Sequence, residues 1–208
     1  MNDIKNSSIV VMVFAKAPRA GKVKTRIGKK IGMKNAEKIY RTLLSNLLKR
    51  LTDDRQLSVQ LWCWPDTKHS FFKYCARHYR VSLHTQRGSD LGAKMSNACK
   101  DSCRNYGYAI IAGSDLPEID SKVCKRAYEA LKLMDVVLAP TFDGGYGLIA
   151  VNNPNNRLFN NMRWSEQTVL SYTLNRARRQ QLKVKCLDLI GDIDTYEDFQ
   201  GLKRQSKR

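Results

Sequence analysis

Long apolar stretches, internal repeats and low-complexity linkers are all missing from this chain of 208 residues. No segment reaches the roughly 18 uninterrupted apolar residues that a membrane-spanning helix needs. Residues 1–5 lack the apolar core of a secretion signal. We therefore expect a cytoplasmic protein without a membrane span. No change of composition marks a second domain, so the length predicts one domain over residues 1–208.

The six cysteines form no C-x-x-C pair. Four of them lie in predicted helices or strands, where a thiol behaves as a small hydrophobic group, so we expect reduced thiols. Cys99 and Cys103 have a spacing that a metal can use, but no histidine or further cysteine lies near them in the sequence. We expect both to be structural, and we assign no chemistry to the three histidines, which all lie in the first half of the chain.

Acidic residues are scarce beside basic ones: 19 Asp and Glu stand against 37 Lys and Arg, a formal net charge of +18. This excess predicts attraction to polyanions such as nucleotides, phosphorylated substrates, nucleic acid or an anionic membrane surface. Part of the charge lies on predicted helix faces and in the basic tail at residues 203–208, where it can serve solubility alone.

One hypothesis is therefore a non-catalytic protein that binds nucleic acid without sequence preference. Its support is the basic tail and a run of arginines, together with aromatic side chains able to stack on bases. Those aromatics lie in predicted strands and helices, where such side chains more often belong to the core. The arginines are Arg176, Arg178 and Arg179, and the aromatics are Trp62, Trp64, Tyr74 and Tyr79.

Short apolar runs alternate with helical patterns along almost the whole chain. This order predicts an α/β fold with an open, mostly parallel sheet covered by helices on both faces. Thr195 with Asp198 three residues later resembles a capping box that starts a terminal helix. Predicted strands cover residues 9–15, 59–64, 81–85, 108–112, 136–139, 147–151 and 184–190, and predicted helices cover 34–51, 68–78, 91–106, 121–133 and 166–181.

A basic loop follows the first predicted strand. It holds five cations in eleven residues, and at the carboxyl end of a strand such a loop can wrap a nucleotide phosphate. It is not a Walker A loop, because Val23 follows Gly21-Lys22 and Lys16 occupies the place of the first glycine. The G-x-G-x-x-G motif is also absent, which argues against a dinucleotide site of that type. The cations are Lys16, Arg19, Lys22, Lys24 and Arg26.

Acidic residues follow two of the predicted strands. Asp115 comes after residues 108–112, and Asp192 and Asp194 come after the last predicted strand. Because the carboxyl ends of parallel strands meet at one edge of a sheet, these carboxylates could hold Mg²⁺ or Mn²⁺ that bridges phosphates. A helix cap is the alternative for this segment, since Asp120 lies close by.

The segment Asp143-Gly144-Gly145-Tyr146 joins two predicted strands. Asp-Gly-Gly in that position is a common turn, and a turn is the interpretation that we favour for Asp143. The glycines could let a substrate approach the backbone.

Six segments, in register and in order, resemble a bacterial family of glycosyltransferases labelled as radical-SAM/selenodomain-associated or arsenosugar-biosynthesis transferases, within the nucleotide-diphospho-sugar transferase superfamily. More distantly, the chain is similar to 2-phospholactate and molybdenum-cofactor guanylyltransferases. Leu116, Tyr196 and Thr141-Phe142 depart from the family's usual residues. The segments are residues 14–26, 88–92, 113–117, 143–146, 164–165 and 192–198.

The resemblance implies a GT-A-like three-layer α/β/α sandwich and a set of roles. Asp115 and one of Asp192 or Asp194 would hold the metal, and Asp115, Lys16 and Arg26 would carry catalysis. The nucleotide would be bound by Lys16, Arg19, Gly21, Lys24, Thr25, Arg26, Gln86, Gly88, Asp90 and Gly92. The acceptor side would comprise Asp143, Gly144, Gly145, Tyr146, Trp164 and Ser165.

The expected function is a metal-dependent transferase that uses a nucleotide-sugar or a nucleoside triphosphate and an unknown small-molecule acceptor. Glycosyl transfer is the first expectation, and nucleotidyl transfer to a phosphorylated small molecule is the alternative. The charge of the basic loop favours a triphosphate, and the resemblance favours a sugar. Either reaction would depend on positioning and electrostatic stabilisation rather than on a nucleophilic side chain.

Overall fold

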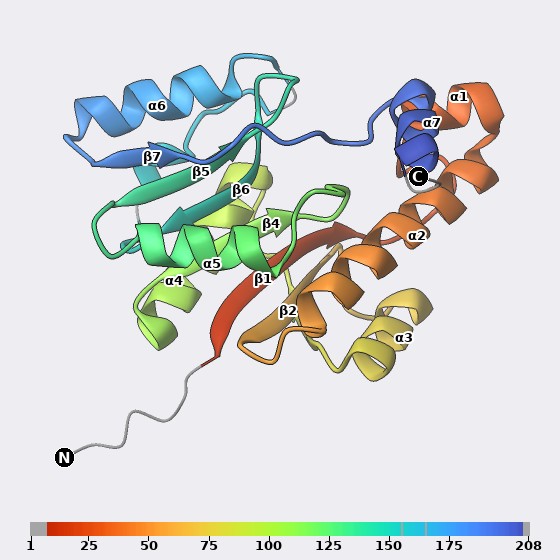
Figure 1. Ribbon diagram of the computed structural model, residues 1–208, viewed down its shortest axis with the longest axis horizontal. Coiled ribbons are helices and arrows are strands. Elements are labelled where there is room, and N and C mark those ends of the chain that lie inside the picture. The colour runs from red at the N-terminus through yellow and green to blue at the C-terminus, as the bar shows by residue number, and fades with distance from the viewer. Residues whose placement is uncertain (1–7, 155, 165, 206–208) are drawn as a thin grey trace.

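A computed structural model describes residues 8–154, 156–164 and 166–205 (Figure 1). Its described strands form one sheet of seven in the order β3-β2-β1-β4-β6-β5-β7. Strand β6 is antiparallel to both of its neighbours, and the other neighbouring pairs are parallel. The strands are β1 (Ile9–Lys16), β2 (Leu57–Trp64), β3 (Ser82–Thr85), β4 (Ala109–Gly113), β5 (Val136–Pro140), β6 (Tyr146–Val151) and β7 (Val184–Cys186).

Helices cover both faces of this sheet. On one face α2, α3 and α5 cover the sheet, and Leu44 of α2 and Phe72 of α3 belong to the same core cluster as Val11 of β1. On the other face α4 and α6 form a second core, in which Cys99 packs with Met12. The predicted mostly parallel sheet between helices is therefore confirmed. The helices are α1 (Thr25–Ile31), α2 (Met33–Thr52), α3 (Ser70–Tyr79), α4 (Leu91–Tyr106), α5 (Ser121–Ala130), α6 (Val169–Arg179) and α7 (Tyr196–Gln205), with a 3-10 turn η1 at Asn156–Leu158.

Strand β1 is central because its residues are apolar on both faces. Val11, Met12 and Val13 are all fully buried, which is what a continuous β-branched run predicts for a strand covered on two sides. Phe14 lies opposite Trp62 of β2 and opposite Gly113 of β4. The chain leaves β1 toward β2 and returns on the other side at β4, so these two strands form the point where the strand order reverses.

Helix α1 begins within the segment that was expected to be a basic loop and continues beyond it. It forms because Ile27 and Ile31 give the segment an apolar face, and Ile27 is fully buried. This face packs with α2 and with Ile193 in a third cluster. In Figure 1, α1 and α7 lie together beyond the carboxyl end of β1.

Two other boundaries differ from expectation. The helix expected from residue 166 begins at Val169. Strand β7 ends at Cys186, but the chain continues beside β5, with a bridge between Ile190 and Thr141. The prediction of a strand over residues 184–190 therefore placed this segment correctly beside the sheet, but the regular strand is shorter than predicted.

All six cysteines are free thiols, and four of them are buried. Trp62 is buried in the core, whereas Trp64 and Tyr74 are exposed. In the part of the chain that the structure describes, none of the helices combines the length and apolarity needed to cross a membrane.

Candidate functional site

Two adjoining cavities open at the carboxyl ends of β1 and β4. The first has a volume of about 500 Å³ and is bounded by the loop after β1, the start of α1 and the end of β4. The second, of about 240 Å³, is bounded by the β5–β6 turn, the end of β4 and the segment before α6. Leu91, Gly113 and Asp115 line both cavities, so Asp115 lies at their junction. A strand-order reversal is where α/β proteins commonly bind ligands.

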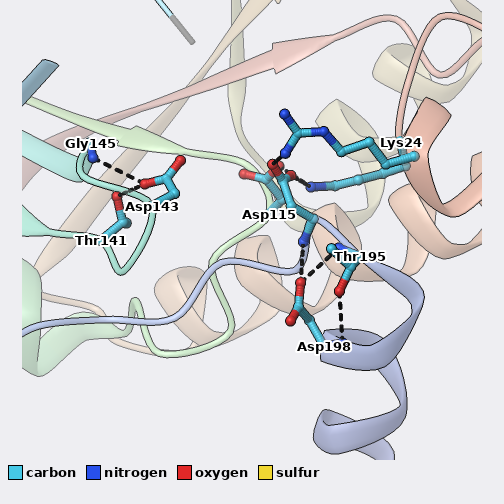
Figure 2. Close-up of polar contacts among 9 residues, drawn as sticks. Lys24, Asp115, Thr141, Asp143, Gly145, Thr195 and Asp198 are labelled. Atoms are coloured by element: carbon cyan, nitrogen blue, oxygen red, sulfur yellow. Dashed lines mark hydrogen bonds and ion pairs between the residues drawn. The ribbon is translucent and has the colours of Figure 1, made fainter. Parts of the chain in front are cut away.

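Lys24 joins two carboxylates at this junction (Figure 2). Its Nζ lies 2.5 Å from Asp115 Oδ2 and 2.8 Å from Asp194 Oδ1. The lysine side chain is only 5% exposed, against 31% for Asp115 and 39% for Asp194. Arg26 makes a longer contact of 3.3 Å to Asp194 from an exposed position. Burial lowers the pKa of Lys24, but the two carboxylates outweigh burial and raise it, so this ammonium stays charged.

The same geometry tests whether a divalent metal fits. One oxygen of Asp115 and one of Asp194 converge on a single point, where the Lys24 ammonium stands in for a cation. Hard carboxylate oxygens suit Mg²⁺ and Mn²⁺, and Mg²⁺ is commonly held by one or two carboxylates plus phosphate oxygens and water. Within the described residues no group of three or more His, Cys, Asp or Glu is arranged to hold a metal. The donors therefore fit an ion that arrives with a phosphate ligand.

Asp115 is positioned by the turn that follows β4. Arg50 donates to the carbonyls of Leu116 and Ile119, each at 3.2 Å, and fixes this turn against α2. Asp120 supplies the helix cap, because its carboxylate accepts from the N–H of Val123 at the start of α5. The capping alternative therefore applies to Asp120, and the carboxylate of Asp115 faces the two cavities.

Tyr40 ties the two strand ends together beneath the first cavity. Its hydroxyl accepts from the backbone N–H of Lys16 at 2.9 Å and lies 3.0 Å from Ser114 Oγ. Burial raises the pKa of Tyr40, and the charge of Asp115 raises it further, so the phenol stays neutral. Tyr40 was not among the expected site residues. Its only signal in the sequence was a hydroxyl on the apolar face of an amphipathic helix.

Carboxylates dominate the second cavity. Asp115, Asp143, Glu166 and Asp192 line it, and no Lys, Arg or His is among its described lining residues. Burial, together with the nearby charges of Asp194, Asp143 and Asp115, raises the pKa of Asp192 to about 6. Glu166 was not among the expected site residues, although it directly follows the expected pair Trp164 and Ser165 in the sequence.

Asp143 also serves the turn that the sequence predicted for it. Its Oδ1 accepts from Thr141 Oγ1 at 2.6 Å and from the N–H of Gly145 at 3.0 Å, as Figure 2 shows. Gly144 has φ +83° and lies against Gln167. Gly145, Tyr146 and Trp164 line the second cavity with Asp143, whereas Gly144 does not. Ser165 lies outside the described residues.

The residues expected to bind the nucleotide divide into two groups. Gln86 lines the first cavity and donates to the carbonyls of Ala15 and Trp62, which bridges β1 and β2. Lys16, Lys24, Thr25 and Arg26 also line it, and Lys22 joins them. The other five do not line it: Arg19, Gly21, Gly88, Asp90 and Gly92.

Three of these five have structural roles around α4. Asp90 caps the helix by accepting from the N–H of Ala93 at 2.8 Å. Gly88 has φ +147° and lies directly on the first turn of α4. Gly92 lets α4 approach Phe159, because a Cβ would lie 2.5 Å from the Phe159 carbonyl oxygen.

Comparison with solved structures confirms the GT-A-like fold. A protein from Desulfovibrio desulfuricans, provisionally described as a nucleotide-diphospho-sugar transferase, is 29% identical, with a TM-score of 0.86 over 99% of this chain and 89% of that chain. A cytidylyltransferase from Leptospira borgpetersenii is 17% identical (TM-score 0.63, 94% of this chain, 85% of that chain). A 4-diphosphocytidyl-2C-methyl-D-erythritol synthase from Anaerococcus prevotii is 13% identical (TM-score 0.63, 98% and 100%). The last two share the fold alone.

No curated protein matches the sequence. Residues 47–166 match the family described as "Uncharacterized protein conserved in bacteria (DUF2064)". The match spans more than half of the chain and includes the end of β4, the β5–β6 turn and Trp164, which all border the second cavity. The chain belongs to the DUF2064 family.

Proposed function

We propose that this protein is a metal-dependent transferase that binds a nucleotide donor in the first cavity and transfers a group to a small molecule in the second. The observation that carries the proposal is the shared position of Asp115 between a cavity lined by cations and a cavity lined by acids. The description of the Desulfovibrio relative as a nucleotide-diphospho-sugar transferase agrees with it.

The first cavity suits the phosphates of a nucleotide. Lys16, Lys22, Lys24 and Arg26 line it and would neutralise phosphate oxygens. Asp115 and Asp194 would hold Mg²⁺ or Mn²⁺, which when bound neutralises charge on the departing phosphate. Gln86 and Tyr40 fix the floor of the cavity, so the cations meet the phosphates at defined positions.

Within this proposal we favour glycosyl transfer. An acceptor that carries a phosphate would enter a cavity that holds four carboxylates and, among its described residues, no cation to pair with it. A hydroxyl-rich group can instead donate hydrogen bonds to those carboxylates. The second cavity therefore suits a sugar or another uncharged polar molecule better than a phosphorylated one. We include in this proposal that the protein is a transferase of the arsenosugar-biosynthesis type, as the sequence resemblance implies.

Nucleotidyl transfer is the second candidate. It draws support from the four cations of the first cavity, which match the charge of a triphosphate, and from similar folds among cytidylyltransferases. It would need an acceptor whose attacking group is compatible with the acidic second cavity.

The test is a thermal-unfolding screen with nucleoside triphosphates and nucleotide-sugars, each with Mg²⁺ and with Mn²⁺, followed by product analysis. A ligand at 100 times its dissociation constant stabilises the folded state by about 2.7 kcal/mol. Release of a nucleoside diphosphate identifies glycosyl transfer, and release of pyrophosphate identifies nucleotidyl transfer. A screen in which no ligand stabilises the protein under any metal condition contradicts the proposal.

The nucleic-acid hypothesis makes a different prediction in the same assay. Non-specific binding through surface cations depends steeply on salt and does not depend on a single carboxylate in a cavity. Nucleic-acid affinity that survives Asp115→Asn, in a protein that binds no nucleotide, would favour that hypothesis over a transferase.

A further inference from the structure

The Lys24 ammonium occupies the point on which the two metal-binding carboxylates converge. Its side chain is 5% exposed, and it contacts Asp115 at 2.5 Å and Asp194 at 2.8 Å. Its backbone has φ +46° at the start of α1, so the side chain enters the site from a fixed turn. We infer that Lys24 makes metal binding depend on the nucleotide: it holds the metal position in the free protein and yields it only when a polyphosphate takes over its charge.

This inference rests on the proposed function and concerns its order of binding. A divalent ion that arrives alone meets two carboxylates that are already paired with Lys24. It would have to separate both ion pairs and leave a nearly buried ammonium without a partner, which is costly. It would also lie a few ångströms from that ammonium, where like charges repel. Metal alone should therefore bind weakly.

A metal that arrives with a polyphosphate faces neither cost. Lys24 itself lines the first cavity together with Lys16 and Lys22, so phosphate oxygens entering that cavity come within its reach. The ammonium then exchanges one anionic partner for another and stays paired. The freed oxygens of Asp115 and Asp194 become available to the ion, while phosphate supplies further ligands. The ligand class that opens the site is thus a metal–polyphosphate complex.

The experiment measures the binding of Mn²⁺ alone, by the electron paramagnetic resonance signal of the free ion and by thermal unfolding. The variants are Lys24→Ala and a matched control, Lys29→Ala, which removes an exposed cation from the same short helix. We expect the wild type and Lys29→Ala to bind Mn²⁺ weakly. We expect Lys24→Ala to bind it at least about tenfold more tightly, because the repelling ammonium is gone and Asp115 and Asp194 have lost the partner that they share. Mn²⁺ should then also raise the unfolding temperature of that variant.

Two further arms keep the test decisive. If Lys24→Ala fails to fold, Lys24→Gly replaces it, since glycine adopts φ +46° without strain. In the wild type, Mn²⁺ and inorganic pyrophosphate together should stabilise more than the sum of the two separate effects.

The inference is overturned if wild-type protein binds Mn²⁺ alone as tightly as the Lys24 variants do. In that case a nucleotide screen that still gives metal-dependent binding leaves the proposed function standing. A wild type to which no nucleotide binds under any metal condition overturns the proposed function instead, whatever the Lys24 variants do with Mn²⁺.

Discussion

At the scale of a single residue, Gly144 shows how closely the β5–β6 turn packs against the segment before α6. A Cβ at this position would lie 2.0 Å from the carbonyl oxygen of Gln167, and φ is +83°. We predict that Gly144→Ala destabilises the protein by about 3 kcal/mol or more, because backbone strain and a steric clash add. Gly21→Ala is the matched control, since Gly21 has φ +77° with nothing within 4 Å of its Cβ position. It should cost only about 1 kcal/mol in urea unfolding. Equal losses at the two sites would contradict the account.

The Tyr40 hydroxyl is a second single group that holds the site together. It accepts from the Lys16 N–H and contacts Ser114, so it connects β1 and β4. Tyr40→Phe leaves a backbone donor without its partner, and we expect a loss of about 1–3 kcal/mol in chemical denaturation. Tyr74→Phe removes a hydroxyl from an exposed side chain and should change the stability by less than about 0.5 kcal/mol.

Asp192 should make stability depend on pH. Its folded-state pKa of about 6 lies above the ordinary value of an unfolded aspartate, so between these two values the folded state binds more protons than the unfolded state. The free energy of unfolding contributed by this group therefore falls as pH rises through that window. Asp192→Asn removes this loss, so the variant should gain stability relative to wild type at about pH 7.5 and lose that gain near pH 4.

Asp188→Asn is the control, because the pKa of Asp188 is lowered and its effect on stability should change with pH in the opposite direction. A hydrogen bond and the charge of Arg126 lower the pKa of Asp188, which is exposed, so its small contribution is present at neutral pH and lost in acid. Urea unfolding in EDTA across the pH series measures both variants. A wild-type minus Asp192→Asn difference that does not vary with pH would show that Asp192 has an ordinary pKa.

At the scale of elements, α7 positions Asp194. Thr195 Oγ1 accepts from the N–H of Asp198 at 3.2 Å, and Asp198 Oδ2 accepts from the N–H groups of Thr195 at 2.7 Å and Asp194 at 3.1 Å (Figure 2). This confirms the capping box predicted from the sequence. Ile193, which precedes the helix, and Tyr196 within it pack against α1 and α2.

Thr195→Ala should therefore cost about 1 kcal/mol in unfolding and should speed amide exchange in the first turn of α7. The control is Thr42→Ala: Thr42 lies within α2, where its hydroxyl donates a hydrogen bond to the carbonyl of Lys38. This substitution should change the stability by less than about 0.5 kcal/mol. Exchange in α7 that is unaltered by Thr195→Ala would show that packing alone holds the helix.

Elements with strong periodicity were predictable, and contacts between distant elements were not. The run at residues 9–15 identified β1, because β-branched residues on both faces have few alternatives. Helix α1 was missed because its cations obscured the apolar pair Ile27 and Ile31. The contact of Lys24 with Asp194 could not be predicted from the sequence. It depends on the left-handed backbone conformation of Lys24, which brings its side chain to a residue 170 positions later in the chain.

At the scale of the whole molecule, charge is separated across the site although the chain as a whole has a net charge of +18. Cations gather at the first cavity and carboxylates at the second, and Asp115 belongs to both. The sequence predicted that the acids and the basic loop lie at strand ends. It could not assign them to two cavities, because that assignment depends on where α7 and the β5–β6 turn lie relative to β4. A donor and an acceptor of different charge would be sorted by this arrangement.

The most direct test of the transferase proposal is the affinity of the best nucleotide ligand, measured by calorimetric titration with and without Mn²⁺ in the wild type, Asp115→Asn and Lys29→Ala. The account predicts that the wild type and Lys29→Ala bind it only with metal, and that Asp115→Asn binds at least about tenfold more weakly, because the carboxylate shared by the two cavities is neutral. Binding that is independent of metal and unchanged in Asp115→Asn would contradict the account.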